Sequence, residues 1–338
     1  MKLTIPMPDD WHVHFRQGRE LENYASIHAR SFGRALVMPN TVPPLTEPGQ
    51  IVEYKNQINK AAPSMEVVSS FRLMPDMRED QISGLFNSGI KVGKYYPDGA
   101  TTNSANGIKN WRAIEEALGT MEEKGMILSV HGENTRAPAE EREEAFLPEF
   151  REIRRAFKKL KIVFEHVSSA STVCEIADSD EYTAATVTLH HLLFTLEDLI
   201  GNSMNPHLFC KPVLKSRYDR EAVAERVLTS DSKFFFGSDS APHKKEAKES
   251  SLVPAGIFSS PVILPALAQW FEENSALDRM MPFLCLYGRE FYGYPANPGT
   301  VTLERKEWTV PETEAGCVPL FAGKSLSWRI EGISGSGS

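Results

Sequence analysis

Short apolar runs alternate with amphipathic stretches along most of this chain of 338 residues. Eight of the runs have the length and composition of buried strands: 11–15, 34–38, 66–71, 90–95, 126–131, 161–166, 184–188 and 233–238. The helical patterns between them include 47–61, 107–124, 141–160, 168–179 and 219–230. Because strands that alternate with helices pair in parallel, eight such units favour a (β/α)8 TIM barrel over a doubly wound sheet.

The C-terminal part of the chain departs from this alternation. Residues 262–292 have the pattern of further helices, and 300–303 and 326–330 predict short strands packed outside the barrel. We therefore expect a single domain over 1–333, consisting of the barrel and a small C-terminal extension, because α/β barrels of this size commonly form one domain. The Ser-Gly repeat at 334–338 resembles a remnant of cloning and is set aside.

Composition excludes several classes of partner. The net charge of −8 argues against general binding to nucleic acids or to anionic membrane surfaces. We expect neither a membrane span nor a signal peptide, because no apolar run is long enough and the first ten residues lack the required pattern. The four cysteines are far apart and form no C-x-x-C motif, which favours reduced thiols in a cytoplasmic protein; they are Cys174, Cys210, Cys285 and Cys317.

Two histidines one residue apart lie in the first predicted strand. Successive side chains of a strand point to opposite faces, so His12 and His14 would direct both imidazoles toward one point. Neutral imidazole is a common ligand of zinc and similar metals. Arg16 continues the same face and suggests an anionic substrate beside a metal. Alone, the H-x-H pattern is weak, because most such pairs are ordinary strand histidines.

Polar side chains that can bind a metal or a substrate end most of the predicted strands. They are His12, His14, Asn40, Lys94, His131, His166 and Asp239. Each has a structural explanation when taken singly, such as a hydrogen-bonded core histidine, a strand-end lysine or a turn-capping aspartate. In a barrel, however, the C-terminal strand ends form the active site, so their joint placement predicts a metal site there. Four other histidines are predicted to be structural: His28, His190, His191 and His207.

These rim residues lie within motifs that resemble the amidohydrolase superfamily, and within it the dihydroorotases of the shorter, stand-alone bacterial type. The resemblance covers nearly the whole chain. The matching segments are Pro8-Asp9-Asp10-Trp11-His12, Val37-Met38-Pro39-Asn40, Tyr96-Pro97, Ala100-Thr101-Thr102-Asn103-Ser104, Val130-His131-Gly132-Glu133, Phe164-Glu165-His166 and Asp239-Ser240-Ala241-Pro242-His243. The last segment and Ala-Thr-Thr-Asn-Ser are far more specific than H-x-H.

The resemblance implies two zinc ions per subunit. The first would be held by His12, His14 and Asp239, and the second by His131 and His166. Lys94 would bridge both ions after N-carboxylation by carbon dioxide. Such a bridge is chemically reasonable, because a free ammonium has no lone pair and repels two dications, whereas a carbamate is an anionic oxygen ligand.

The resemblance also assigns residues to the substrate. Arg16, Asn40 and His243 would hold its α-carboxylate, an arrangement that suits a planar guanidinium fork. Thr101 and Thr102 would lie on a loop that closes over the substrate; its small polar residues are equally typical of an ordinary surface loop. Lys211, at a position where some relatives have leucine, would contact the substrate through its backbone, and Ala255 falls at a further contact position.

The implied reaction is the reversible cyclisation of N-carbamoyl-L-aspartate to L-dihydroorotate in pyrimidine biosynthesis. Asp239 would act as general acid and base, and the enzyme would be a homodimer. One alternative is a hydantoinase or allantoinase, but a neutral cyclic amide needs no arginine clamp such as Arg16. Another is a non-catalytic barrel that serves as a scaffold, which is disfavoured because all six ligand positions are filled.

Overall fold

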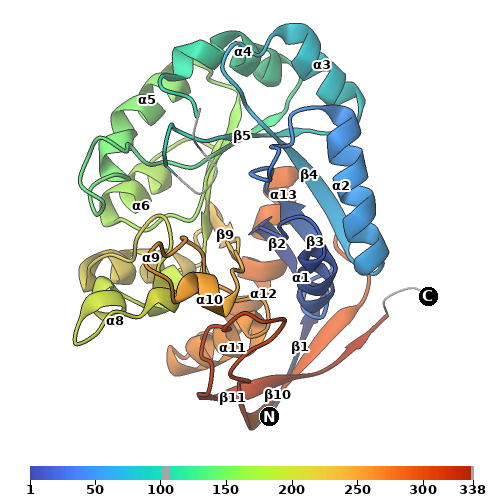
Figure 1. Ribbon diagram of the computed structural model, residues 1–338, viewed down its shortest axis with the longest axis vertical. Coiled ribbons are helices and arrows are strands. Elements are labelled where there is room, and N and C mark those ends of the chain that lie inside the picture. Colours follow the sequence, from blue (N-terminus) through green and yellow to red (C-terminus); the bar gives the residue numbers. More distant parts are fainter. Residues whose placement is uncertain (101–106, 336–338) are drawn as a thin grey trace.

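The computed structural model describes residues 1–100 and 107–335, and eight parallel strands form its centre (Figure 1). They pair in chain order and are β2 (Asp9–Val13), β3 (Arg34–Val37), β4 (Glu66–Arg72), β5 (Val92–Tyr95), β6 (Ile127–Val130), β7 (Lys161–Phe164), β8 (Thr183–Val187) and β9 (Phe234–Phe236). The predicted barrel is confirmed. Five of its strands are shorter than the predicted apolar runs, β2 and β8 have the predicted length, and β4 is one residue longer.

The first and last strands of the barrel meet just beyond their C-terminal ends. The amide of Asp239 donates to the carbonyl of His12 at 2.8 Å, and the amide of His14 donates to Ser240 at 3.0 Å. An isolated parallel bridge between Val13 and Ser240 lies at the same place. The barrel is therefore nearly closed, and its seam runs through residues that were predicted to bind metal.

One layer of the barrel interior is apolar. Each of the eight barrel strands contributes one buried side chain to it: Trp11, Leu36, Val68, Val92, Ile127, Val163, Ala184 and Phe235. Trp11, one of the residues of this layer, stacks on Tyr292, with ring centroids 4.2 Å apart. Because this layer fills the middle of the barrel, the polar side chains at the C-terminal strand ends have an apolar floor beneath them.

Helices surround the strands and extend the chain at its C-terminal end (Figure 1). They are α1 (Glu20–His28), α2 (Pro48–Ala61), α3 (Glu79–Asn87), α4 (Glu115–Glu123), α5 (Leu147–Ala156), α6 (Ala170–Ala177), α7 (Leu189–Leu193), α8 (Leu196–Ile200), α9 (Arg217–Leu228), α10 (Lys245–Lys248), α11 (Ile263–Glu273), α12 (Leu277–Cys285) and α13 (Tyr287–Tyr292). Short 3-10 helices lie at Trp111–Ile114, Glu144–Phe146 and Pro206–Leu208. In the part of the chain described, no helix is both long and apolar enough to cross a bilayer.

A second sheet lies outside the barrel. It is antiparallel and consists of β1 (Lys2–Pro6), β10 (Thr300–Thr309) and β11 (Ser325–Ser334), with β10 in the middle. The expected strands at 300–303 and 326–330 therefore exist but are longer than predicted. The strand β1 was not expected, and its partner lies at the other end of the chain. The last residue of β11, Ser334, belongs to the terminal segment that was set aside.

Candidate metal centre and active site

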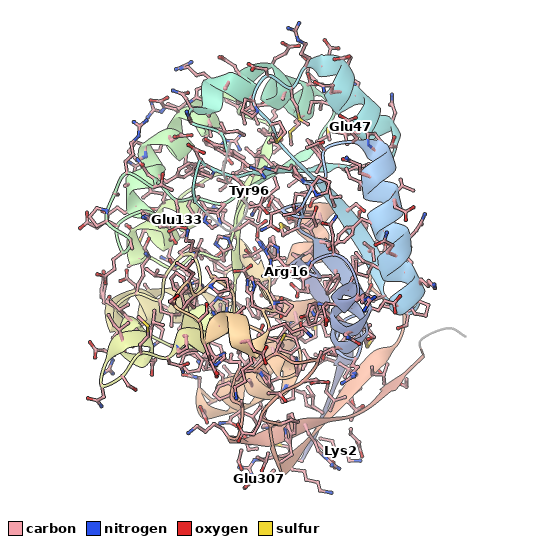
Figure 2. All side chains as sticks on the ribbon, in the orientation of Figure 1. Lys2, Arg16, Glu47, Tyr96, Glu133 and Glu307 are labelled. Carbon is pink, nitrogen blue, oxygen red and sulfur yellow. The ribbon has the colours of Figure 1, made fainter. Side chains whose placement is uncertain are left out.

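The barrel strands bring the six predicted metal ligands to one end of the barrel. His12 lies in β2 and Lys94 in β5; the others follow shortly after strand ends, and all six side chains are buried: His12, His14, Lys94, His131, His166 and Asp239. Figure 2 labels Arg16 and Tyr96, which neighbour this group, near the middle of the ring of helices. The site therefore occupies the barrel mouth.

The four histidine rings form a continuous row. The ring centroids of His14 and His12 are 5.3 Å apart, those of His12 and His166 are 5.1 Å apart, and those of His166 and His131 are 4.7 Å apart. These rings come from three strand ends that are far apart in sequence. Such convergence of imidazole rings is typical of a metal centre rather than of separate structural histidines.

Asp239 meets one end of this row. Its Oδ1 lies 3.1 Å from Nε2 of His14 and 3.5 Å from Nε2 of His12, and these three side chains converge as one group of candidate ligands. Burial by itself would raise the pKa of Asp239, but the close approach of the His14 and His12 rings outweighs it and holds this pKa well below its usual range. The carboxylate is therefore ionised at neutral pH.

Hydrogen bonds on the far ring nitrogens fix how His12 and His14 face Asp239. Nδ1 of His12 lies 2.8 Å from the carboxylate of Glu165, and Nδ1 of His14 lies 2.7 Å from Oδ1 of Asn40. Burial, despite the nearby carboxylate of Asp239, lowers the pKa of His14 to about 4, so its ring is neutral and has one proton. With that proton on Nδ1, the Nε2 lone pair faces Oδ1 of Asp239. Two hydrogen-bond acceptors at this distance repel each other unless a cation lies between them.

Glu165 remains ionised although it is fully buried. Burial by itself would raise its pKa, but the charges of Lys94 and His12 and hydrogen bonds from His12 and Ser129 hold the pKa at about 2. The hydroxyl of Thr186 also donates to Glu165, at 2.6 Å. This carboxylate therefore accepts the Nδ1 proton of His12 and leaves Nε2 free to bind a metal.

Lys94 has an amine that nothing in the described residues satisfies. Its side chain is fully buried, and Nζ has no hydrogen-bond partner within residues 1–100 and 107–335. Burial, opposed by the charges of Glu165 and Asp239, lowers the pKa of Lys94 to about 8. An unpaired buried ammonium is costly, so this position favours a neutral amine or a modified one.

His131 and His166 form the other end of the row. Nε2 of His131 lies 2.6 Å from the carboxylate of Glu133, which leaves Nδ1 to face the site. Nδ1 of His166 is buried and has no hydrogen-bond partner among the described residues. Burial, together with the charges of His131 and His12, lowers the pKa of His166 well below its usual value. Both rings are thus placed as metal ligands would be.

Two of these ligands and Arg16 have unusual backbone conformations. Arg16, His166 and Asp239 have positive φ angles of 60°, 42° and 45°. Residues other than glycine adopt this region at a cost, and they do so most often at functional sites, where the surrounding structure holds them in place. The coincidence of three such residues at the barrel mouth is an independent indication of function.

The predicted substrate residues line a pocket beside Asp239. Arg16, Asn40, Lys211 and Ala255 all border this pocket. Nη2 of Arg16 lies 2.8 Å from Nε2 of His243, which is 3.0 Å from the carbonyl of Ala255. Burial and the charge of Arg16 lower the pKa of His243 to about 3, so this ring is neutral. The arrangement offers a fixed cation and neutral polar groups to an anion.

Two predicted site residues are not described by the structure, and two residues of the site were not predicted from the sequence. Thr101 and Thr102 fall outside the described residues. Glu133 and Glu165 were present in the recognised motifs but were given no role, although each lies within two residues of a predicted ligand in sequence. Their proximity to His131 and His166 was the available signal, but the partner that Glu165 actually orients is His12, on another strand.

Comparisons with known proteins agree with this geometry. The amidohydrolase family profile matches residues 9–305. The chain is 39% identical to a dihydroorotase of Variovorax paradoxus, covering 97% of this chain and 98% of that protein. It is 38% identical to a dihydroorotase of Pseudomonas syringae pv. syringae, covering 98% of each.

Solved structures give the same result. The dihydroorotase of Campylobacter jejuni superposes with a TM-score of 0.92 at 35% identity, covering 98% of each chain. The dihydroorotase of Saccharomyces cerevisiae in complex with 5-fluoroorotic acid superposes with a TM-score of 0.91 at 33% identity, also covering 98% of each. An L-hydantoinase of Arthrobacter aurescens has a TM-score of 0.84 at only 16% identity, covering 100% of this chain and 85% of that one, and shares the fold alone.

Proposed function

The chain belongs to the amidohydrolase family and, within it, to the dihydroorotases, and from this premise we propose that its barrel mouth interconverts N-carbamoyl-L-aspartate and L-dihydroorotate with a pair of metal ions. This reaction is a step of pyrimidine biosynthesis. The observation that carries the proposal is the row of four buried histidines that ends on Asp239, with the fully buried amine of Lys94 among the same group of side chains.

We assign the metal ligands as two groups joined by Lys94. His12, His14 and Asp239 would hold one ion, and His131 and His166 the other. The donor set of imidazoles and carboxylate suits zinc. The lone-pair contact between His14 and Asp239 supports this assignment, because a cation between them would turn it into two coordinate bonds.

Lys94 is proposed to be N-carboxylated. A neutral amine attacks carbon dioxide, a C–N bond forms, and one proton leaves to solvent. The pKa of about 8 keeps part of Lys94 neutral near pH 7, because burial disfavours its charged form. The resulting carbamate would supply oxygens to both metals and would remove the unpaired amine from the core.

The substrate α-carboxylate is proposed to bind Arg16. This guanidinium is partly buried next to His243 and the carbonyl of Pro242, to which its Nε donates at 3.0 Å. A partly buried guanidinium at the pocket gives a charge-assisted contact to a carboxylate. A hydantoin without a carboxylate would not use it, which favours dihydroorotate over the neutral cyclic amides.

Asp239 is proposed to move the proton. When bound, the metal pair would supply Lewis acidity that activates water and polarises the ring carbonyl. In the hydrolytic direction the carboxylate of Asp239 accepts the proton of the attacking water and then donates it to the departing ring nitrogen. Both histidine contacts of Asp239 involve Oδ1, so we assign proton transfer to Oδ2. Cyclisation follows the same steps in reverse.

The decisive test is turnover of L-dihydroorotate and carbamoyl aspartate in the presence of zinc and bicarbonate, with hydantoin and allantoin as controls. Activity on the first pair alone is expected. Activity on the controls alone would overturn the substrate assignment, and inactivity on all four by metal-loaded protein would overturn the function.

The pH dependence of the end point gives a second check on the reaction. Carbamoyl aspartate is a dianion near neutrality and dihydroorotate a monoanion, so cyclisation consumes one proton. Lower pH should therefore shift the enzyme-catalysed equilibrium toward the ring, and higher pH toward the open form. An equilibrium ratio that does not change with pH would contradict the assigned reaction.

We also propose that the enzyme works in the cytoplasm as a homodimer. The four cysteines are all free, as expected in a reducing compartment. Homodimers are the commonest assemblies of soluble enzymes. Sedimentation equilibrium of the purified chain tests the second point, and a monomer at micromolar concentration would contradict it.

A further inference from the structure

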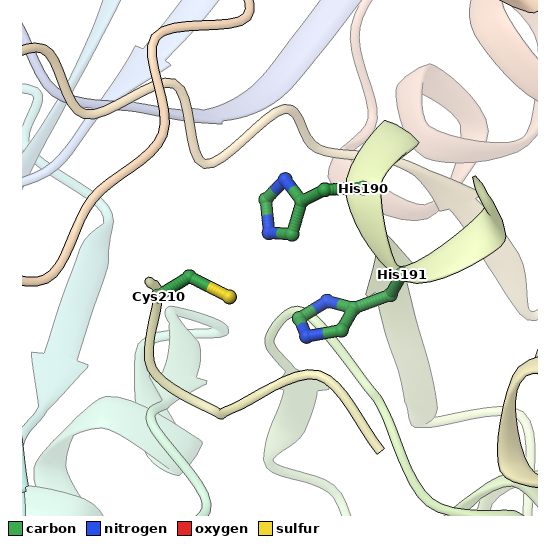
Figure 3. A group of neighbouring side chains, drawn as sticks. All are labelled: His190, His191 and Cys210. Atoms are coloured by element: carbon green, nitrogen blue, oxygen red, sulfur yellow. The ribbon is translucent and has the colours of Figure 1, made fainter. Parts of the chain in front are cut away.

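A second cluster of metal-type side chains lies outside the six assigned ligands. His190 and His191 on α7 and Cys210 on the loop before α9 are all buried, and their ligand atoms lie within 4.8 Å of one another. The two ring centroids are 4.6 Å apart. Figure 3 shows both rings projecting from α7 toward the loop that carries Cys210.

His190 is the residue of this cluster that the fold leaves unsatisfied. Its side chain is fully buried, and neither Nδ1 nor Nε2 has a hydrogen-bond partner within the described part of the chain. A neutral imidazole has one donor and one acceptor, and leaving buried polar atoms unpaired is unfavourable. The sequence interpretation of His190 as a structural histidine does not account for this.

The other two side chains converge on one backbone carbonyl. Nε2 of His191 lies 3.2 Å from the carbonyl oxygen of Pro212, and Sγ of Cys210 donates to the same oxygen at 3.1 Å. On the far side of the ring, Nδ1 of His191 lies 2.9 Å from Oγ1 of Thr188. A hydroxyl in this place can accept from Nδ1, which frees Nε2 as a ligand and orients the ring.

We propose that His190, His191 and Cys210 bind a third metal ion of the zinc class, separate from the binuclear centre. A thiolate with two imidazoles is a donor set that zinc favours, and three protein ligands leave a fourth position for solvent. On binding, the S–H bond of Cys210 breaks, its proton leaves to solvent and a sulfur–metal bond forms. His191 moves its proton to Nδ1, which then donates to Thr188.

Such an ion would influence the substrate pocket through the backbone that joins Cys210 to Lys211. Cys210 directly precedes Lys211, which lines the pocket beside Arg16 and Asp239. A metal held between this loop and α7 would fix the position of Lys211 relative to β8. The site itself does not depend on the identity of the reaction, so the proposed function and this inference can fail separately.

Cobalt(II) absorption provides the test, because a thiolate ligand gives a charge-transfer band that nitrogen and oxygen ligands do not. All six assigned ligands of the binuclear centre are nitrogen or oxygen donors. Titration of the metal-free full-length protein with Co²⁺ should give this band and one more bound ion per chain than the binuclear centre holds. The Cys210→Ser variant should lose both the band and the additional ion.

Two further variants complete the experiment. Cys285→Ser changes another buried cysteine, whose Sγ donates to Pro6, and should keep the band. His190→Gln retains the thiol. The cobalt affinity measured from the thiolate band should fall about tenfold or more in this variant, since even outer-shell partners of a metal have effects of that size. Circular dichroism establishes that each variant is folded.

Three results would overturn the proposal: no thiolate band in the wild type at saturating cobalt, an undiminished band in Cys210→Ser, or unchanged affinity in His190→Gln. Should Cys210→Ser fail to fold, the wild-type spectrum and His190→Gln decide the matter by themselves.

Discussion

At the scale of single residues, Asp239 has two proposed roles, as a metal ligand and as the group that transfers the proton. Asp239→Asn keeps an oxygen ligand but cannot accept a proton, so metal content should persist while kcat falls about 100- to 10,000-fold in both directions. Elemental analysis and turnover of each substrate measure this. Asp278→Asn, with a side chain 74% exposed, is the control. Near-normal turnover of Asp239→Asn would rule out the proton-transfer role.

Arg16 is proposed to bind the carboxylate of the anionic substrate. Arg16→Met should raise the KM for dihydroorotate about 10- to 100-fold and change kcat less, because hydrogen bonds to charged groups contribute about 1.5–3 kcal/mol. Steady-state kinetics measure the effect. The neighbouring exposed Arg19 provides the matched control Arg19→Met. An unchanged KM in Arg16→Met would place the carboxylate elsewhere.

The residue types of the site could be predicted from sequence, whereas their contacts could not. His12, His14 and Asp239 were identifiable because barrel strands end at one rim. The bond between His14 and Asn40 joins two strands, and the bond between His12 and Glu165 joins two more distant ones. Which ring nitrogen faces the metal depends on these contacts, and no local pattern in the sequence contains that information.

At the scale of elements, α10 holds together two loops that border the substrate pocket. Its buried Lys248 donates to the carbonyls of Phe209 at 3.0 Å, Pro254 at 3.1 Å and Gly256 at 2.9 Å. One loop leads to Lys211 and the other carries Ala255. A single ammonium therefore fixes the two segments that are proposed to contact the substrate.

Lys248→Met should disturb this arrangement without touching the proposed chemistry. Three buried carbonyls would lose their donor, so we expect the free energy of unfolding to fall by about 1–3 kcal/mol and the KM for dihydroorotate to rise severalfold. Denaturant unfolding and steady-state kinetics measure the two effects. Lys245→Met, on the same helix but half exposed, is the control. Wild-type KM in a destabilised Lys248→Met would limit this residue to a structural role.

The accuracy of the fold prediction differed between elements for a physical reason. The barrel strands are buried on both faces and therefore form continuous apolar runs, which a sequence reveals directly. The strand β1 alternates polar and apolar residues over only five positions, and it is stabilised by β10 almost at the other end of the chain. α3 is a short helix of nine residues with only Ile82 and Leu85 buried, too weak a pattern to be recognised.

At the scale of the whole molecule, the proposed metal centre also completes the barrel. β2 and β9 are joined at their seam by the backbone bonds of His14 and Asp239, and the same two residues, with His12, are proposed to hold one ion. A metal bound there would link the first and last strands. Loss of the metal should therefore lower the stability of this seam more than that of the rest of the barrel.

Removal of metal by a chelator should lower Tm and speed amide exchange at residues 12–14 and 237–241 more than at β4, which lies two strands from β2 and carries no proposed ligand. Each ion contributes about 4 kcal/mol when its free concentration exceeds Kd about a thousandfold, because it binds the folded state alone. Calorimetry and hydrogen exchange measure the two effects, and added zinc should reverse both. Equal Tm with and without metal, or faster exchange spread evenly over all strands, would contradict a metal that closes the barrel.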